Sequence, residues 1–134
     1  MQATGEFEVN LQPLDPFAKG SEGISLGRLS IDKTFRGDLV AESRGEMLSV
    51  TTKVKGSAGY VAIEQVNGTL QGKRGTLVLQ HFGIASHGAN RLVLEVVPDS
   101  GTGQLANLSG EMTINIEEDK HTYEFDYTLP LIID

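Results

Sequence analysis

The 134-residue sequence contains no cysteine and no tryptophan, and only four prolines. The lack of cysteine excludes a disulfide framework, a thiolate metal site and a cysteine nucleophile. Basic residues are also scarce, because 11 Lys and Arg stand against 18 Asp and Glu and the formal net charge is −7. Such a surface repels nucleic-acid phosphates and anionic membranes, so we expect neither as a partner.

Long hydrophobic runs are missing as well. No window of the sequence approaches the roughly 18 apolar residues that a membrane-spanning helix requires, and the first residues show no signal-peptide pattern. We therefore expect a soluble, cytoplasmic protein. A length of 134 residues fits one domain covering residues 1–134, which would bury about two-thirds of the unfolded surface.

Glycine, in contrast, is abundant, with 16 residues that separate short runs of alternating apolar and polar side chains. Alternation with period two is typical of half-buried strands. Seven to nine strands at this spacing predict an all-β fold, a small antiparallel barrel or sandwich. The main expected strands are residues 5–11, 24–35, 38–52, 59–66, 76–82, 91–97, 111–117 and 121–129.

Three of the expected corners carry turn residues. Asn67 and Gly68 predict a hairpin with a type I′ turn, since both tolerate a positive φ. Glu118 and Asp119 predict the turn of the last hairpin. Gly45 is the natural place for a bulge or corner within the long segment 38–52.

Three glycine-rich motifs resemble one known family. Residues 68–81 read Gly-x-Leu-x-Gly-x-x-Gly-x-Leu-x-Leu-x-His, residues 97–105 read Val-Pro-Asp-Ser-Gly-Thr-Gly-x-Leu, and residues 120–123 read Lys-His-x-Tyr. Together they resemble the bacterial domain-of-unknown-function family 3224 over nearly the whole chain. That family looks like the allene-oxide-cyclase-like barrels, whose shape is related to that of lipocalins. The resemblance implies a single antiparallel eight-stranded barrel and, as in several relatives, a homo-oligomer (a dimer or larger).

The resemblance implies no activity, because the family has none assigned. The pocket residues of the cyclases have no counterpart in the motifs of this chain, so none is carried over. Residues 101–106 match the dinucleotide-binding spacing Gly-x-Gly-x-x-Ala, but an alternating run follows at Met112 and leaves room for one helical turn at most. Because a dinucleotide site requires a longer helix, we expect a corner loop and no cofactor.

The histidines offer the first candidate site residue. His81 ends the expected inward face that includes Leu77 and Leu79, where an imidazole could act as a base or orient a polar ligand. The alternative is a histidine at a strand end that bonds to backbone or water. His81, His87 and His121 lack the spacing of metal ligands, so we expect no metal site.

Glu64 has two alternative positions. If Ala62 and Val66 point inward, Glu64 is a buried carboxylate with a raised pKa and a candidate acid or base. If Val61 and Ile63 point inward, Glu64 is a solvated charge. The greater bulk of Val61 and Ile63 favours the second arrangement.

Tyr60 and Tyr123 can offer hydroxyl groups to a ligand, although tyrosines on strands are more often packing residues. With Glu64 and His81 they form the predicted set of ligand-binding residues. The leading hypothesis is a non-catalytic barrel that binds a small apolar molecule. The alternatives are a cofactor-free isomerase or cyclase that uses Glu64 or His81, and a packed oligomerisation module with a filled interior and an apolar surface patch.

Overall fold

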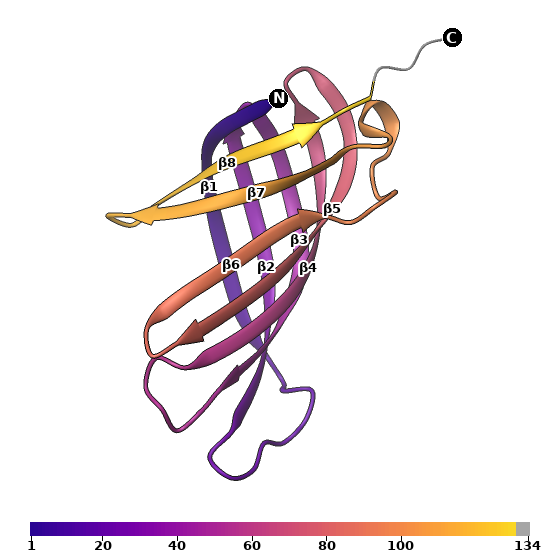
Figure 1. Cartoon of the computed structure of the whole chain (residues 1–134). Helices are drawn as coiled ribbons and strands as arrows, with labels where there is room; N and C mark the ends of the chain where they lie inside the picture. The colour runs from indigo at the N-terminus through magenta and orange to yellow at the C-terminus, as the bar shows by residue number, and fades with distance from the viewer. Residues whose placement is uncertain (131–134) are drawn as a thin grey trace.

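The computed structural model describes residues 1–130, which form eight strands and one turn of 3-10 helix (Figure 1). Each strand pairs antiparallel with its neighbour in the chain, and β8 pairs with β1 to close the barrel. The predicted all-β, eight-stranded antiparallel barrel is therefore confirmed. The elements are β1 (Gln2–Leu14), β2 (Ser25–Gly37), β3 (Leu39–Thr51), β4 (Ala58–Leu70), β5 (Lys73–Ser86), β6 (Ala89–Val96), η1 (Gly103–Leu105), β7 (Ser109–Glu117) and β8 (Lys120–Thr128).

The hydrophobic core fills one half of the barrel. Inward-facing side chains from all eight strands form it, including Phe7, Phe35 and Phe125. Leu105 and Leu108, from the connection between β6 and β7, close this end of the barrel and are buried. We call it the closed end, and the opposite end, bounded by residues 15–24, 52–57 and 87–88, the open end. None of the helical structure in residues 1–130 is long and apolar enough to cross a membrane.

The motif at residues 97–105 packs against β5 at the closed end. Beyond the end of β6, the side chains of Ser100 and Thr102 bond to backbone amides of β5 that have no neighbouring strand on that side. The Ser100 Oγ accepts a hydrogen bond from the Val78 amide at 3.0 Å, and the Thr102 Oγ1 accepts one from the Thr76 amide at 3.0 Å. Only η1 is helical here, so the predicted corner loop is confirmed and the residues of the motif have a structural role.

Two of the predicted corners are wrong. Asn67 and Gly68 lie inside β4, and the β4–β5 turn is formed by Gln71 and Gly72, whose φ values are 45° and 85°. Gly68 is needed in the strand because a Cβ there would meet the Val40 carbonyl oxygen and the Ala41 backbone. Gly45 also lies in an unbroken ladder, without a bulge. The turn at Glu118 and Asp119 is confirmed, with φ values of 47° and 66°.

The wall of the barrel is unevenly paired. The β3–β4 ladder joins every residue of Leu39–Thr51 to a partner, whereas β6 and β7 pair only at Leu94–Met112 and Glu95–Glu111. The β1–β8 ladder ends at Phe7 and His121. In Figure 1, β7 and β8 cross the barrel obliquely near its closed end. Toward the open end, the rest of β1 is not paired with β8 and the rest of β6 is not paired with β7.

Candidate functional site

The orientation of β4 decides where Glu64 lies. Ala62, Glu64 and Val66 are buried in the barrel, whereas Val61 and Ile63 are exposed on its outer surface. The interpretation that placed Val61 and Ile63 inside is therefore wrong. An eight-stranded barrel has room for few side chains in its interior, and here the bulkier pair lies outside.

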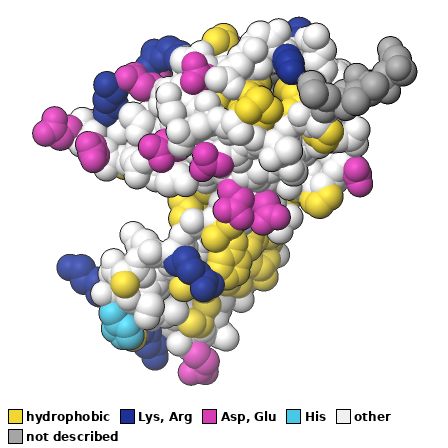
Figure 2. All heavy atoms as spheres, turned by 45° about the horizontal axis from the view of Figure 1, so that its top comes forward, with side chains coloured by type: hydrophobic (Ala, Val, Ile, Leu, Met, Phe, Trp, Pro, Cys, Tyr) yellow, Lys and Arg dark blue, Asp and Glu magenta, His cyan; other side chains and the backbone are white. Residues whose placement is uncertain are grey.

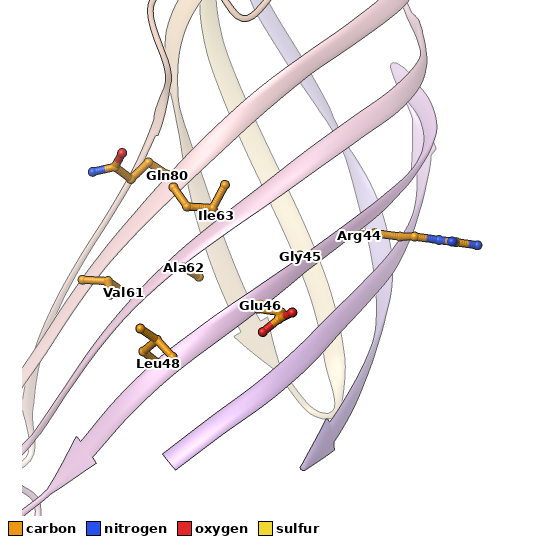
Figure 3. Close-up of a pocket in the computed structure, with 8 residues that line it drawn as sticks. All are labelled: Arg44, Gly45, Glu46, Leu48, Val61, Ala62, Ile63 and Gln80. Atoms are coloured by element: carbon orange, nitrogen blue, oxygen red, sulfur yellow. The ribbon is translucent and has the colours of Figure 1, made fainter. Parts of the chain in front are cut away.

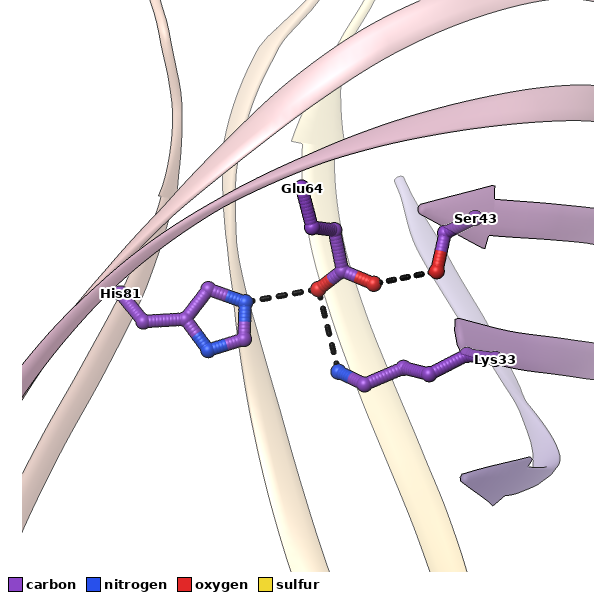
Figure 4. A network of polar contacts seen from close by, with 4 residues as sticks. All are labelled: Lys33, Ser43, Glu64 and His81. Carbon is purple, nitrogen blue, oxygen red and sulfur yellow. Dashed lines mark hydrogen bonds and ion pairs between the residues drawn. The ribbon is translucent and has the colours of Figure 1, made fainter. Parts of the chain in front are cut away.

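Glu64 is the centre of a buried polar cluster (Figure 4). Its side chain has 0% exposure and is surrounded by Lys33 of β2, Ser43 of β3 and His81 of β5. The Lys33 Nζ and the His81 Nε2 lie 3.0 Å and 2.6 Å from the Glu64 Oε1. The Ser43 hydroxyl donates to the Glu64 Oε2 at 2.5 Å. We call these four residues the Glu64 cluster.

The Glu64 cluster holds a carboxylate. Burial by itself raises the pKa of Glu64, but the His81 hydrogen bond, the Lys33 charge and the Ser43 hydrogen bond together lower it to about 2. The predicted raised pKa is therefore wrong, because the sequence does not show these three neighbours. An ionised carboxylate only accepts hydrogen bonds, so the Nε2 of His81 carries a hydrogen, and in the neutral ring Nδ1 is left as an acceptor.

Lys33 is held by aromatic rings as well as by Glu64. Its Nζ lies 5.0 Å from the centre of the Phe7 ring and 5.8 Å from the centre of the Phe35 ring. Cation–π attraction of this kind partly replaces the water that a buried ammonium loses. Within residues 1–130, every buried side-chain nitrogen or oxygen has at least one hydrogen-bond partner.

The Glu64 cluster separates the packed core from a more exposed inner surface. Toward the open end, inward-facing Leu29, Met47 and Tyr60 are only half-buried, and Leu92 is 41% exposed. The Tyr60 ring occupies the space that a side chain at Gly83 would need, and burial raises its pKa. Lys33 and His81 are buried but each keeps 5% side-chain exposure, whereas Glu64 has none.

Tyr123 lies apart from the other predicted residues. Its hydroxyl accepts a hydrogen bond from the Leu39 amide at 2.9 Å and donates one to the Arg36 carbonyl at 2.8 Å. These bonds tie β8 to the β2–β3 turn at the closed end. The structure thus brings Glu64 and His81 together, with Tyr60 on the same inner surface, while a ligand-binding role for these residues and for Tyr123 stays a prediction.

Lys33 and Ser43 were not predicted as site residues. A signal for Lys33 is present, because it alternates with Ile31 and Phe35 and therefore shares their inward face. A lysine on an apolar strand face needs a buried partner. Ser43 follows Leu39 and Ala41 on the inner face of β3, but a serine there gives no comparable signal.

Other charged clusters are few in the part of the chain that the structure describes. No group of three or more His, Asp or Glu side chains in residues 1–130 is arranged to hold a metal ion. His87 lies in the β5–β6 turn, and the His121 ring packs 5.1 Å from the Phe7 ring.

A large concavity lies on the outside of the barrel (Figure 3). It measures about 810 Å³ and is lined by outward-facing residues of β3 and β4, with Gln80 of β5. Gly45 and Ala62, which lie on the inward faces of β3 and β4, also line it, and the backbone of β4 approaches β3 closely at Gly45. The lining residues are partly apolar, such as Leu48 and Ile63, and partly charged, such as Arg44 and Glu46.

Comparisons with known proteins agree with this fold. No curated protein matches the chain. A solved structure of a protein of unknown function from Shewanella oneidensis MR-1 is 55% identical, with a TM-score of 0.95, and the match covers 98% of each chain. That protein is described as a member of the DUF3224 family, and the model of that family matches residues 3–127 here. The chain therefore belongs to the family of proteins of unknown function DUF3224, as the glycine motifs predicted.

Proposed function

We propose that this protein binds a small, largely apolar molecule on the inner surface between the Glu64 cluster and the open end. The observation that carries the proposal is the Glu64 cluster itself. A buried ion pair costs desolvation energy, and well-packed hydrophobic residues in its place are often equally stable or more stable. Packing alone therefore does not explain Lys33, Glu64 and His81 inside this barrel.

The exposure of the inner surface supports the same proposal. Leu11 and Leu92 are exposed although both are on strand faces that point into the barrel, and Met47 and Tyr60 are half-buried. Apolar side chains left in contact with water favour an apolar ligand. Here they lie on the same inward strand faces as Lys33 and His81, on the side of the Glu64 cluster toward the open end.

The chemistry of the Glu64 cluster defines the polar part of the ligand. The Nδ1 of a neutral His81 is an acceptor, and the Lys33 ammonium has donors beyond the one that faces Glu64. A hydroxyl group on an apolar molecule matches both, because it can donate to the His81 Nδ1 and accept from Lys33, and an anionic group matches Lys33 alone. The proposed role is non-catalytic, and no cofactor is needed for it; the Glu64–His81 contact would also suit a cofactor-free isomerase, which is the alternative. The proposed compartment is the cytoplasm, with which a cysteine-free chain is compatible.

Titration with 1-anilinonaphthalene-8-sulfonate, an apolar fluorophore with one anionic group, tests the proposal. We expect saturable binding at one site per chain, with a Kd of order micromolar. Leu92→Asn should weaken binding about tenfold or more, because it places a polar group on the inner surface.

Leu48→Asn is the matched control. Leu48 is 38% exposed, close to the 41% of Leu92, but it lies on the outer surface of the barrel. This variant should bind the fluorophore as the unmodified protein does. If Leu48→Asn abolishes binding and Leu92→Asn does not, the fluorophore binds in the outer concavity and the proposed inner site is wrong. No saturable binding at all would also contradict the proposal.

A further inference from the structure

The outer surface of the barrel is strongly asymmetric. Outward-facing positions of β1, β7 and β8 are mostly polar or acidic, for example Glu8 of β1, Glu111 of β7 and Glu124 of β8. The outer surface of β3–β6 near the open end instead exposes large hydrophobic residues, and Figure 2 shows hydrophobic side chains gathered on this half of the molecule. The exposed residues are Leu48, Val61, Ile63, Phe82, Ile84 and Val93.

Four of these residues form one continuous row across the strands. Leu48 is paired with Val61, Val61 with Phe82, and Phe82 with Val93. We call Leu48, Val61, Phe82 and Val93 the outer row. Because paired residues on one face of a sheet touch each other, the outer row is a hydrophobic strip four strands wide. Contiguous strips of this kind on a soluble protein mark interaction sites.

Two opposite charges flank the outer row on β6. Arg91 precedes Val93 by two residues and Glu95 follows it by two, so both point outward beside the row. The Arg91 guanidinium lies 5.2 Å from the centre of the Phe82 ring and so covers part of the row. In residues 1–130, neither Arg91 nor Glu95 forms an ion pair, although six other ion-pair contacts are present.

We propose that two copies of this chain associate face to face through the outer row, about a two-fold axis that runs along it. This axis places Glu95 of each copy opposite Arg91 of the other, which forms two ion pairs from charges that have no ion-pair partner within residues 1–130. It also places Ile63 of one copy opposite Gly59 of the other, where β4 has no side chain.

The symmetry favours a second copy over an unrelated partner. A two-fold interface must be complementary to itself. An apolar row bordered by a base on one side and an acid on the other meets this requirement. Face-to-face packing of two sheets is an established arrangement, with a layer of side chains between them. The acidic outer surfaces of β1, β7 and β8 would repel each other and do not compete for this contact.

Sedimentation velocity of the full chain tests the proposal. We expect a dimer, with twice the 14.4 kDa of one chain, at micromolar concentration. Arg91→Glu should weaken dimerisation about tenfold or more, because it sets an acid opposite each Glu95. The double variant Arg91→Glu with Glu95→Arg should restore the dimer, since the two-fold axis again pairs a base with an acid.

Val61→Lys and Val40→Lys complete the test. Both valines are exposed on the outer surface, but only Val61 belongs to the outer row. Val61→Lys should give a monomer, and Val40→Lys should remain dimeric. A monomeric unmodified chain, or a dimer that Val61→Lys leaves intact, would overturn the proposal. A dimer that Arg91→Glu weakens but the charge exchange fails to restore would do so as well. The dimerisation variants change outward-facing residues, whereas Leu92→Asn, which tests ligand binding, changes an inward-facing one. The two proposals can therefore fail separately.

Discussion

At the scale of single residues, Glu64 shows how neighbours reverse the effect of burial. A carboxyl group alone in a protein interior becomes neutral, because desolvation disfavours its charged form. Three donors from three different strands reverse this preference for Glu64. Glu64 therefore stays negatively charged inside the barrel. Its carboxylate attracts the Lys33 ammonium and accepts a hydrogen bond from the His81 Nε2.

The pKa of Glu64 makes stability depend on pH. This pKa is about 2 in the folded protein, compared with 4.5 for an unperturbed glutamate, which we take for the unfolded chain. A lowered folded-state pKa stabilises the protein above pH 4.5, and this contribution is lost as the pH falls through about 2. We expect it to reach about 3 kcal/mol of unfolding free energy. Urea unfolding between about pH 6 and about pH 2 measures it.

Glu64→Gln is the control for this prediction, because glutamine has a similar shape but does not titrate. Other carboxylates respond to pH equally in both proteins, so the difference in unfolding free energy between them isolates Glu64. That difference should shrink as the pH falls. A difference that stays constant over the whole range would mean that the Glu64 pKa is not lowered.

The sequence predicted half of the Glu64 cluster. Glu64 and His81 drew attention as titratable groups on strands with apolar faces, which is visible along a single strand. That Lys33 and Ser43 lie beside them depends on the register between β2, β3 and β4. Register is set by long-range pairing, which no local pattern in β2 or β3 reveals. The pKa direction was wrong for the same reason.

At the scale of elements, β4 shows what alternation can and cannot predict. Strand 59–66 was predicted and lies within β4, because alternation identifies a strand. The choice of inner face was wrong, since both faces of β4 carry apolar residues and one of them belongs to the outer row. The Asn67–Gly68 turn was wrong because Gly68 serves the close approach of β3 rather than a turn.

Two valine substitutions test where β4 ends. Asn67→Val should change the unfolding free energy by less than about 0.5 kcal/mol, because Asn67 is an exposed strand position. Gly72→Val should cost about 1–2 kcal/mol, since a β-branched residue would have to adopt the positive φ of 85°. No atom lies within 4 Å of a Cβ at Gly72, so this cost comes from the backbone alone. The opposite order in thermal or urea unfolding would place the turn at residues 67–68.

At the scale of the whole molecule, the barrel is closed by the strand pair with the fewest paired residues. The β6–β7 seam, the two residue pairs Leu94–Met112 and Glu95–Glu111, joins the sheet formed by β1–β6 to the β7–β8 hairpin. Charge weakens this seam further, because Glu111 is paired with Glu95 on one side and with Asp126 on the other. In residues 1–130, none of these three acids has an ion-pair partner. Part of the net charge of −7 is therefore concentrated where the wall has the fewest hydrogen bonds.

Hydrogen exchange should reveal this uneven wall. Backbone amides in the centre of β4 should exchange slowest, and those of the β6–β7 seam should exchange fastest among the strands, because local opening needs the fewest broken contacts there. Glu111→Lys should slow exchange at the seam and stabilise the protein by about 1 kcal/mol, since like charges directly opposite each other destabilise a sheet and opposite charges stabilise it. Glu124→Lys is the matched control, because Glu124 is paired with Thr4 and Thr113 and has no acid opposite. Equal protection of the seam and of β4, or equal effects of the two lysine variants, would show that the seam does not limit the closure of the barrel.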